Sequence, residues 1–174
     1  EIIRQDGGVS SFNFDFTERS YVVEKLPQSD KIKKEWFLHN STHVIDMAFF
    51  VGGWPKKITA YKKSGLKWHP SGSIYSGAGI SETGTFFSYH ANWESAGRWS
   101  VEIMTPKHKL IFKPLEKLQI QKMGSMAVEE VKINDKLDIK FKPGLYRLVK
   151  SFLASKEGLP SIKDQVGNLK YYKT

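Results

Sequence analysis

The chain has 174 residues and a formal net charge of +9, and 40% of its residues are hydrophobic. This length and composition predict a single globular domain, 1–174, with a sizeable core. The chain contains no cysteine, which excludes disulfides, thiolate metal sites and cysteine nucleophiles. No apolar run approaches the ~20 residues of a membrane span, so we expect a soluble, cytoplasmic protein that does not bind membranes.

The lysines are dispersed along the chain and form no run of roughly five or six basic residues. Salt-sensitive phosphate binding normally needs a concentrated basic patch. The charge therefore favours a solvated, lysine-rich surface, and we expect no nucleic-acid partner. A small anionic ligand such as a nucleotide sugar is the main alternative.

The first predicted element is a half-buried strand over residues 11–17. Phe12, Phe14 and Phe16 alternate there with polar residues, which is the period of a strand with one apolar face. Residues 21–26, after a short turn, are predicted to form a second strand that pairs with it.

The next element is a helix predicted over residues 41–51. Asn40, Ser41 and Thr42 are all favourable N-cap residues, and an earlier start would bring His39 into the helix. The segment 52–55, with two glycines and then a proline, is typical of a helix end.

The remaining elements are mostly strands. We predict them at 57–63, 85–95, 97–105, 108–114 and 116–123. The connections between the last four are short, so neighbouring strands should form antiparallel hairpins. Helices are predicted at 141–156 and, in the C-terminal tail, within 160–174. The fold class is therefore α+β, an open-faced and mostly antiparallel sheet with helices packed on one face.

The second face of that sheet predicts a partner surface. Strand alternation places large aromatic residues on both sides of the segment 85–95, and helices are expected to cover only one side. Exposed apolar sheet faces usually mark interfaces. We therefore expect a homo-oligomer formed through the open face.

The segment "GAGISETG", residues 77–84, superficially suggests a dinucleotide-binding loop. Its third glycine is misplaced, no apolar strand precedes it, and a strand rather than a helix should follow. We therefore reject a nucleotide site here and expect a turn-rich loop.

Three polar residues, His39, His43 and Asp46, interrupt the apolar stretch 35–55 at spacings of four and three. On a helix these side chains share one stripe. The stripe is compatible with a metal site, although the ligand set is incomplete. It is also compatible with a core histidine that is hydrogen-bonded, or with an acid/base role for His43.

The segment "NSTHVIDMAFFVGGWPKKITAY", residues 40–61, resembles the C-terminal domain of the glucose–fructose oxidoreductase / inositol dehydrogenase / MocA (Gfo/Idh/MocA) family. In that family, a histidine followed by an apolar residue, isoleucine and aspartate begins the helix that faces the substrate. The downstream segment "FSYHANWESAGRWSVEIMTPKHKLIFKPLEKLQIQ" is similar to the sheet of a sugar-dehydrogenase branch, and the resemblance covers roughly residues 35–122.

The resemblance implies an open-faced antiparallel sheet whose substrate cleft forms against a separate N-terminal Rossmann domain. NAD or NADP would bind in that domain, which is absent from this chain, so we expect no cofactor site here and an inactive isolated domain. The chain starts at Glu1 rather than methionine, which fits a domain cut from a dehydrogenase about twice as long.

The resemblance also implies roles for the helix residues. His43 matches the histidine that handles the proton of the substrate hydroxyl, and Asp46 matches an aspartate expected to orient the helix or its histidine. His39 stands where many members have an aspartate that partners this histidine. Either another carboxylate serves as the partner, or proton transfer rests on His43 and a lysine of the absent domain, or the chemistry of this branch is altered. Whether His39 itself replaces the aspartate stays open.

Further substrate contacts are inferred from polarity and order along the chain: Asn40, Tyr89, His90, Asn92, Trp93 and Arg98. The leading interpretation is the substrate-binding and oligomerisation domain of an NAD(P)-dependent oxidoreductase acting on a sugar, nucleotide sugar or cyclitol. The alternative is a non-catalytic module that binds carbohydrate or another protein through its aromatic residues.

Overall fold

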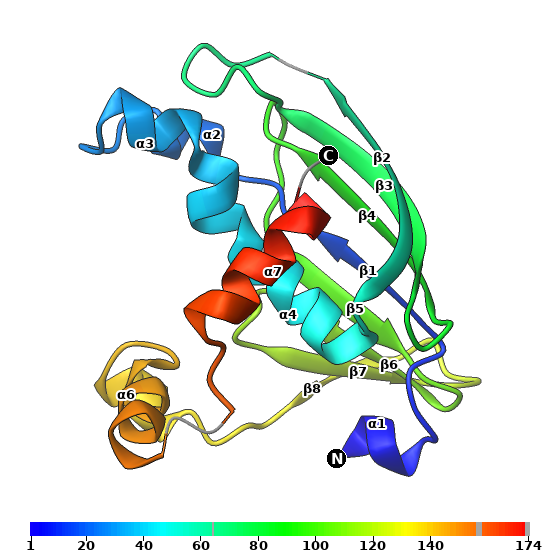
Figure 1. Cartoon of the computed structure of the whole chain (residues 1–174). Helices are drawn as coiled ribbons and strands as arrows, with labels where there is room; N and C mark the ends of the chain where they lie inside the picture. Colours follow the sequence, from blue (N-terminus) through cyan, green and yellow to red (C-terminus); the bar gives the residue numbers. More distant parts are fainter. Residues whose placement is uncertain (64, 156–157, 173–174) are drawn as a thin grey trace. The chain divides into compact units, whose positions relative to one another are not determined.

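A computed structural model describes residues 1–63, 65–155 and 158–172. The chain divides into two compact units, Glu1–Val131 and a second unit that begins at Lys132. The first unit holds an eight-stranded sheet with helices on one face (Figure 1), which confirms the predicted α+β class. Within the described residues, no helix is long and apolar enough to cross a membrane.

The sheet runs in the order β2-β3-β4-β1-β5-β6-β7-β8. All neighbouring pairs are antiparallel except β1 and β4, which are parallel. The strands are β1 (Ser11–Asp15), β2 (Pro55–Lys63), β3 (Ile74–Ser81), β4 (Phe86–Asn92), β5 (Ser100–Met104), β6 (His108–Phe112), β7 (Leu118–Lys122) and β8 (Val128–Val131).

Strand β1 lies in the middle of the sheet, between β4 and β5. The prediction that segments 85–95 and 97–105 pair as a hairpin is therefore wrong. The chain between β4 and β5 passes across the end of β1, where the Trp93 indole donates a hydrogen bond of 3.2 Å to the Phe16 carbonyl. A short connection thus spans one inserted strand, because the first strand of the chain fills the gap.

The predicted strand at 21–26 is also wrong. Residues Ser20–Val23 form the short helix α2 instead, and Asp30–Lys34 form α3. Both edges of β1 are already occupied by β4 and β5, so no position beside it remains for residues 21–26.

The segment 77–84, expected to be a turn-rich loop, belongs mostly to strand β3. Two of its glycines leave space that aromatic rings occupy. A Cβ at Gly77 would lie 2.3 Å from the Tyr89 ring, and one at Gly79 would lie 2.5 Å from the Phe87 ring. Glycine inside a strand is typical where other groups approach the backbone closely, as these rings do.

The helix layer of the first unit consists of a π-helical turn, η1 (Phe37–Ser41), and the helix α4 (Thr42–Gly52). The predicted helix at 41–51 is confirmed, and Gly53, with φ of 109°, follows its last turn. The Phe49 ring packs edge-on against Phe12 and Phe14. A Cβ at Gly52 would lie 2.4 Å from the Phe12 ring, so glycine lets the helix end approach the sheet.

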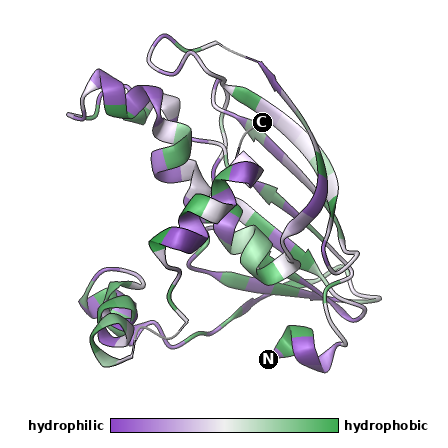
Figure 2. Cartoon of the chain, viewed as in Figure 1, coloured by the Kyte–Doolittle hydropathy of each residue, from purple (hydrophilic) through white to green (hydrophobic). Residues whose placement is uncertain are grey.

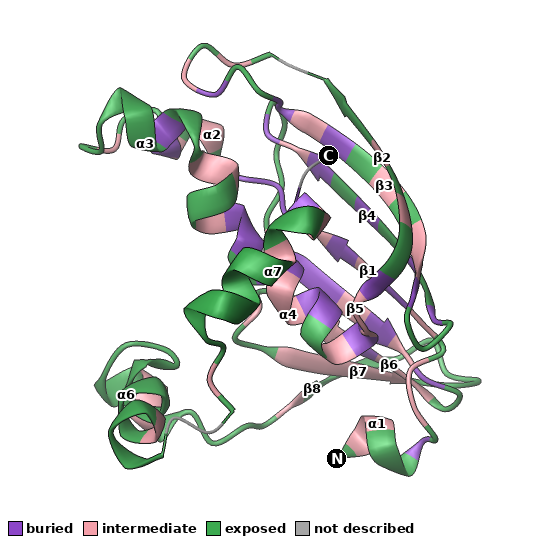
Figure 3. Cartoon of the chain, in the orientation of Figure 1, coloured by how far each residue is buried: buried purple, intermediate pink, exposed green. Residues whose placement is uncertain are grey.

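Figure 3 shows buried residues concentrated on α4 and on the central strands that it covers. The core side chains of the sheet face this helix layer. They are Phe12, Phe14, Phe16, Tyr75, Phe87, Tyr89, Val101, Ile103 and Leu110.

The opposite face of the sheet is mainly polar. Strand register places Asn13, Asp15, Ser76, Ser88 and His90 on it. The exposed large aromatics of this face are few, chiefly Phe86 and Tyr61. The expected row of aromatics is therefore absent from this face, because the alternating aromatics of β1 and β4 point toward α4.

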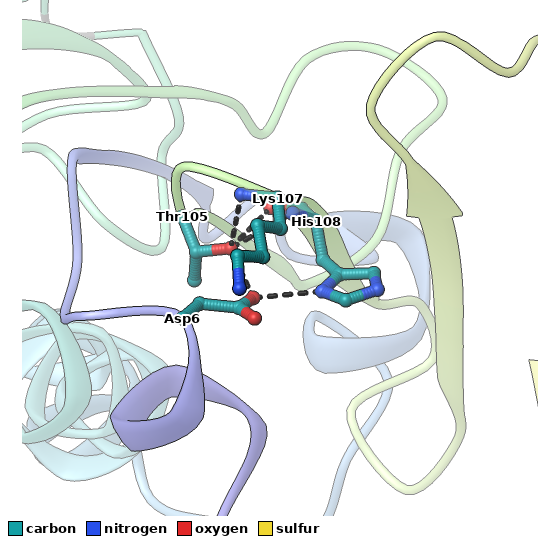
Figure 4. A network of polar contacts seen from close by, with 4 residues as sticks. All are labelled: Asp6, Thr105, Lys107 and His108. Carbon is teal, nitrogen blue, oxygen red and sulfur yellow. Dashed lines mark hydrogen bonds and ion pairs between the residues drawn. The ribbon is translucent and has the colours of Figure 1, made fainter.

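The N-terminal helix α1 (Ile2–Gln5) is tied to the β5–β6 hairpin by Asp6 (Figure 4). The Asp6 carboxylate accepts hydrogen bonds from the Thr105 hydroxyl at 2.6 Å and from His108 Nδ1 at 2.7 Å. These two bonds lower the pKa of Asp6, and the nearby Lys107 acts in the same direction.

The second unit contains α5 (Lys136–Lys140), α6 (Leu145–Ala154) and α7 (Ile162–Tyr172). The predicted helices at 141–156 and within 160–174 are thus confirmed with shorter bounds. Figure 2 colours much of α6 as hydrophobic. Its apolar side chains are only partly covered, with Leu148 and Phe152 each more than half exposed.

Candidate functional site

Three predicted residues come together on the outer side of η1 and α4. His39 and His43 are exposed, and Asp46 is partly exposed. They lie four and three residues apart, the spacing of neighbours on one side of a helix. The inner positions Val44, Ile45 and Ala48 are buried, so the polar stripe faces away from the sheet.

The exposure of His43 argues against a hydrogen-bonded core histidine. The described chain has such a residue elsewhere, His69, which is 1% exposed and whose Nδ1 lies 2.6 Å from the Gly72 carbonyl oxygen. Burial lowers the pKa of His69 and favours its neutral form. The two histidines therefore differ in exposure: His69 is part of the core, whereas the His43 side chain is accessible to a ligand.

Among the described residues, no group of three or more His, Cys, Asp or Glu side chains is placed to hold one metal ion. The stripe formed by His39, His43 and Asp46 is thus not such a cluster. The two imidazoles of the stripe are exposed and accessible to a ligand from solvent.

Below the stripe lies a carboxylate that the sequence analysis did not identify. Glu18 is 2% exposed, and its Oε1 accepts hydrogen bonds from Asn40 Nδ2 at 3.0 Å and from the Ser41 hydroxyl at 2.8 Å. Burial raises the pKa of Glu18, while the bonds from Ser41 and Asn40 oppose that rise. Asn40, predicted to contact substrate, is thus turned toward Glu18.

Arg98 lies close enough to Glu18 for its charge to lower the pKa of that carboxyl. The Arg98 side chain is exposed, and its guanidinium carbon lies 4.9 Å from the centre of the Trp99 ring. Arg98 therefore lies in the neighbourhood of Glu18, whereas the other predicted sheet residues lie elsewhere.

Two predicted substrate residues belong to the core. Trp93 is fully buried and stacks on Trp68 with ring centres 5.9 Å apart. Tyr89 is 7% exposed, and burial raises its pKa to about 12, so its hydroxyl stays protonated at neutral pH. Both side chains are therefore part of the packed core.

His90 and Asn92 also lie away from the stripe. His90 lines a hollow of about 670 Å³ on the open face, together with polar residues that include Asn13, Asp15 and Ser88. Asn92 ends β4, and its side-chain oxygen accepts a bond from the Glu94 amide. The sheet separates His90 from His43, so one small ligand cannot touch both.

Comparison with solved structures shows what the fold is similar to. A levoglucosan dehydrogenase in complex with NADH and levoglucosan matches with a TM-score of 0.58 and 19% identity, over 74% of this chain and 41% of its own. An NAD-binding oxidoreductase from Klebsiella pneumoniae matches with a TM-score of 0.69 and 16% identity, over 98% of this chain and 57% of its own. The UDP-N-acetylglucosamine 3-dehydrogenase GnnA from Acidithiobacillus ferrooxidans matches with a TM-score of 0.55 and 14% identity, over 87% and 46%.

These neighbours are oxidoreductases of the Gfo/Idh/MocA type, so the resemblance found in the sequence is confirmed at the level of the fold. The chain spans about half the length of these structures. No protein-family model matches the chain, and no curated protein matches it either.

Proposed function

We propose that this chain is the substrate-binding domain of an NAD(P)-dependent oxidoreductase that acts on a hydroxyl of a sugar, nucleotide sugar or cyclitol. The observation that carries the proposal is the exposed stripe of His39, His43 and Asp46, in a fold shared with sugar and nucleotide-sugar dehydrogenases. An exposed histidine pair on a helix whose other side is fully packed is suited to bind and deprotonate a ligand rather than to stabilise the core.

In this proposal His43 is the acid/base residue. During oxidation its neutral imidazole accepts the proton of the substrate hydroxyl, and it returns a proton in the reverse direction. Asp46, one turn further along α4, orients the helix or its histidine. His39, one turn before His43, takes the place of the aspartate common in the resembling family.

The nicotinamide cofactor supplies the hydride acceptor or donor when it is bound. The glycines of the segment 77–84 do not fit a dinucleotide site: Gly77 and Gly79 pack against aromatic rings inside β3, which is followed by a strand. We therefore assign NAD or NADP to a separate N-terminal Rossmann domain, which would face the stripe and close the substrate cleft.

We also propose that the open sheet face joins copies of the chain. Its polar character, with exposed Phe86 and Tyr61 among hydrophilic residues, is compatible with a non-obligate interface, since such interfaces are about as apolar as other surfaces. Light scattering tests this part: a monomer at high protein concentration would contradict it.

The function is tested by His43→Ala in the complete polypeptide that carries this chain, assayed with NAD(P)⁺ and a panel of sugars and nucleotide sugars. General acid–base catalysis contributes about 10²–10⁴-fold, so turnover should fall on that scale with the melting temperature nearly unchanged. His90→Ala locates the substrate. A large loss there, with His43→Ala still active, would place catalysis on the open face and overturn the proposal.

His39→Ala decides the role of the first histidine in the same assay. A loss similar to that of His43→Ala would mean that His39 assists the proton transfer. A loss below about threefold would leave His39 as a surface residue and place the proton transfer on His43 alone.

A further inference from the structure

We infer that Glu18 is a positioning residue that fixes the His39–His43 segment on the sheet by holding Asn40 and Ser41. This inference rests on the proposed function, because it assigns Glu18 to the placement of the same catalytic histidine. Glu18 does not face the exposed stripe, so it acts through the turn that carries the histidines.

The backbone that carries Glu18 is held in place by hydrogen bonds. Glu18 follows β1, and the residue before it is held on two sides: the Thr17 amide donates to Asp15 Oδ1 at 2.6 Å, and the Thr17 hydroxyl accepts from the Asn92 amide at 2.9 Å. The end of the central strand is therefore the support from which Glu18 reaches the helix layer.

A single oxygen of Glu18 receives both bonds from the helix layer. Asn40 and Ser41 are consecutive residues of η1, and they lie between His39 and His43 in the chain. Any displacement of these two residues carries both imidazoles with it. Together with the packing of the Phe37 ring on Phe16 and Tyr75, these bonds hold the turn on the sheet.

Ser41 lies where η1 passes into α4. Its backbone is helical, with φ of −67° and ψ of −23°, so the helical backbone is continuous there and Ser41 makes no capping bond. It donates instead to Glu18, and the residue is fully buried.

The backbone conformation of the turn is also unusual. η1 is a π-helical turn, which is rare and is often found at functional sites. The burial of a carboxylate that is only 2% exposed costs free energy unless the group is hydrogen-bonded. If this carboxylate had no role, we would expect an apolar residue at position 18. Both unusual features meet at the segment that presents His43.

Hydrogen–deuterium exchange on the 174-residue chain tests the placement without any assay of activity. Glu18→Ala should speed exchange of the amides in residues 37–46 by about tenfold or more, with little change in β5 to β7. Glu24→Gln, an exposed carboxylate in the same region, is the matched control and should leave the exchange unchanged. Unchanged exchange of residues 37–46 in Glu18→Ala would overturn the inference.

Kinetics of the complete polypeptide test whether the placement serves catalysis. Glu18→Ala should lower kcat about 10- to 100-fold, because misplacement by about 1 Å can cost that much, and should change KM by less than about threefold. In the His43→Ala background the same substitution should add almost no loss. Equal losses in both backgrounds would indicate a merely structural role and overturn the inference.

Two further variants keep the test decisive. Glu18→Gln retains an acceptor oxygen at the same reach and should recover most of the turnover lost in Glu18→Ala. Ser41→Ala removes one donor and should reproduce part of the loss if Glu18→Ala fails to fold. If Glu18→Ala loses exchange protection but keeps an unaltered kcat, the link between Glu18 and catalysis is overturned. Wild-type activity in His43→Ala would instead overturn the proposed function and leave the exchange result intact.

Discussion

Asp6 illustrates how a nearly buried carboxylate stays charged. Its side chain accepts bonds from Thr105 and His108, and both favour the ionised form. Its pKa is therefore lower in the folded chain than its ordinary value of 3.8. A depressed carboxyl pKa contributes stability above the unfolded pKa, and that stability is lost as the pH falls through the folded pKa.

This linkage gives a pH-dependent prediction. Asp6→Asn should lower the melting temperature at pH 5–7, and the difference from the wild type should shrink steadily as the pH falls below about 4. Thermal unfolding followed by circular dichroism between pH 2 and 7 measures the effect. Asp30→Asn, which changes an exposed carboxylate, is the control. A difference that stays constant down to pH 2 would contradict the linkage.

At the same scale, the sequence predicts the positions of the helix residues better than those of the sheet residues. His39, His43 and Asp46 were placed together because helix spacing is local information. Trp93 and Tyr89 were assigned to substrate from polarity and chain order, yet tertiary packing buries both. Glu18 was missed because its partners lie more than twenty residues away, and nothing in the local pattern marks a buried carboxylate.

Among the elements, β3 shows how glycine can belong to a strand. The sequence favours a loop because glycine is a poor strand former. The rings of Tyr89 and Phe87 fill the space above Gly77 and Gly79, so the partner strand supplies the side chains that β3 lacks. Pairing with β4 decides the structure here, and that information is not local.

This arrangement predicts opposite signs for two similar substitutions. Gly77→Ala places a methyl group against the Tyr89 ring and should lower the free energy of unfolding by about 1–3 kcal/mol. Gly167→Ala lies in helix α7, where an added Cβ would meet nothing within 4 Å, and should raise it by up to about 1 kcal/mol. Urea unfolding of both variants measures the pair, and a stabilised Gly77→Ala would show that the ring is not fixed.

The sequence predicts helix α4 nearly to its limits, and glycines mark its C-terminal end. The polar residues before it make no capping bond, because the helical backbone continues from η1. The segment 21–26 failed because an apolar run of six residues is compatible with either a strand or a helix. The occupied edges of β1 decide in favour of α2. Sheet order, unlike helix ends, depends on which strands arrive from distant parts of the chain.

For the molecule as a whole, the proposal that a separate domain binds the cofactor predicts that the 174-residue chain binds no NAD(P). The segment 77–84 does not open a helix in the manner that holds a pyrophosphate, since Gly77 and Gly79 lie within a strand. Calorimetric titration with NAD⁺ and NADP⁺ should give no saturable heat. Micromolar binding to this chain would contradict the assignment of the cofactor to a separate domain.

The central position of β1 has a consequence for how the chain is made. A ribosome releases β1 first, but its two neighbours, β4 and β5, emerge only after the intervening helices and strands. At a synthesis rate of about 5–20 residues per second, the delay between the release of β1 and that of β4 and β5 is on the order of ten seconds. Nascent chains would therefore expose Phe12, Phe14 and Phe16 for that interval, which makes the first strand a natural target for chaperones during synthesis.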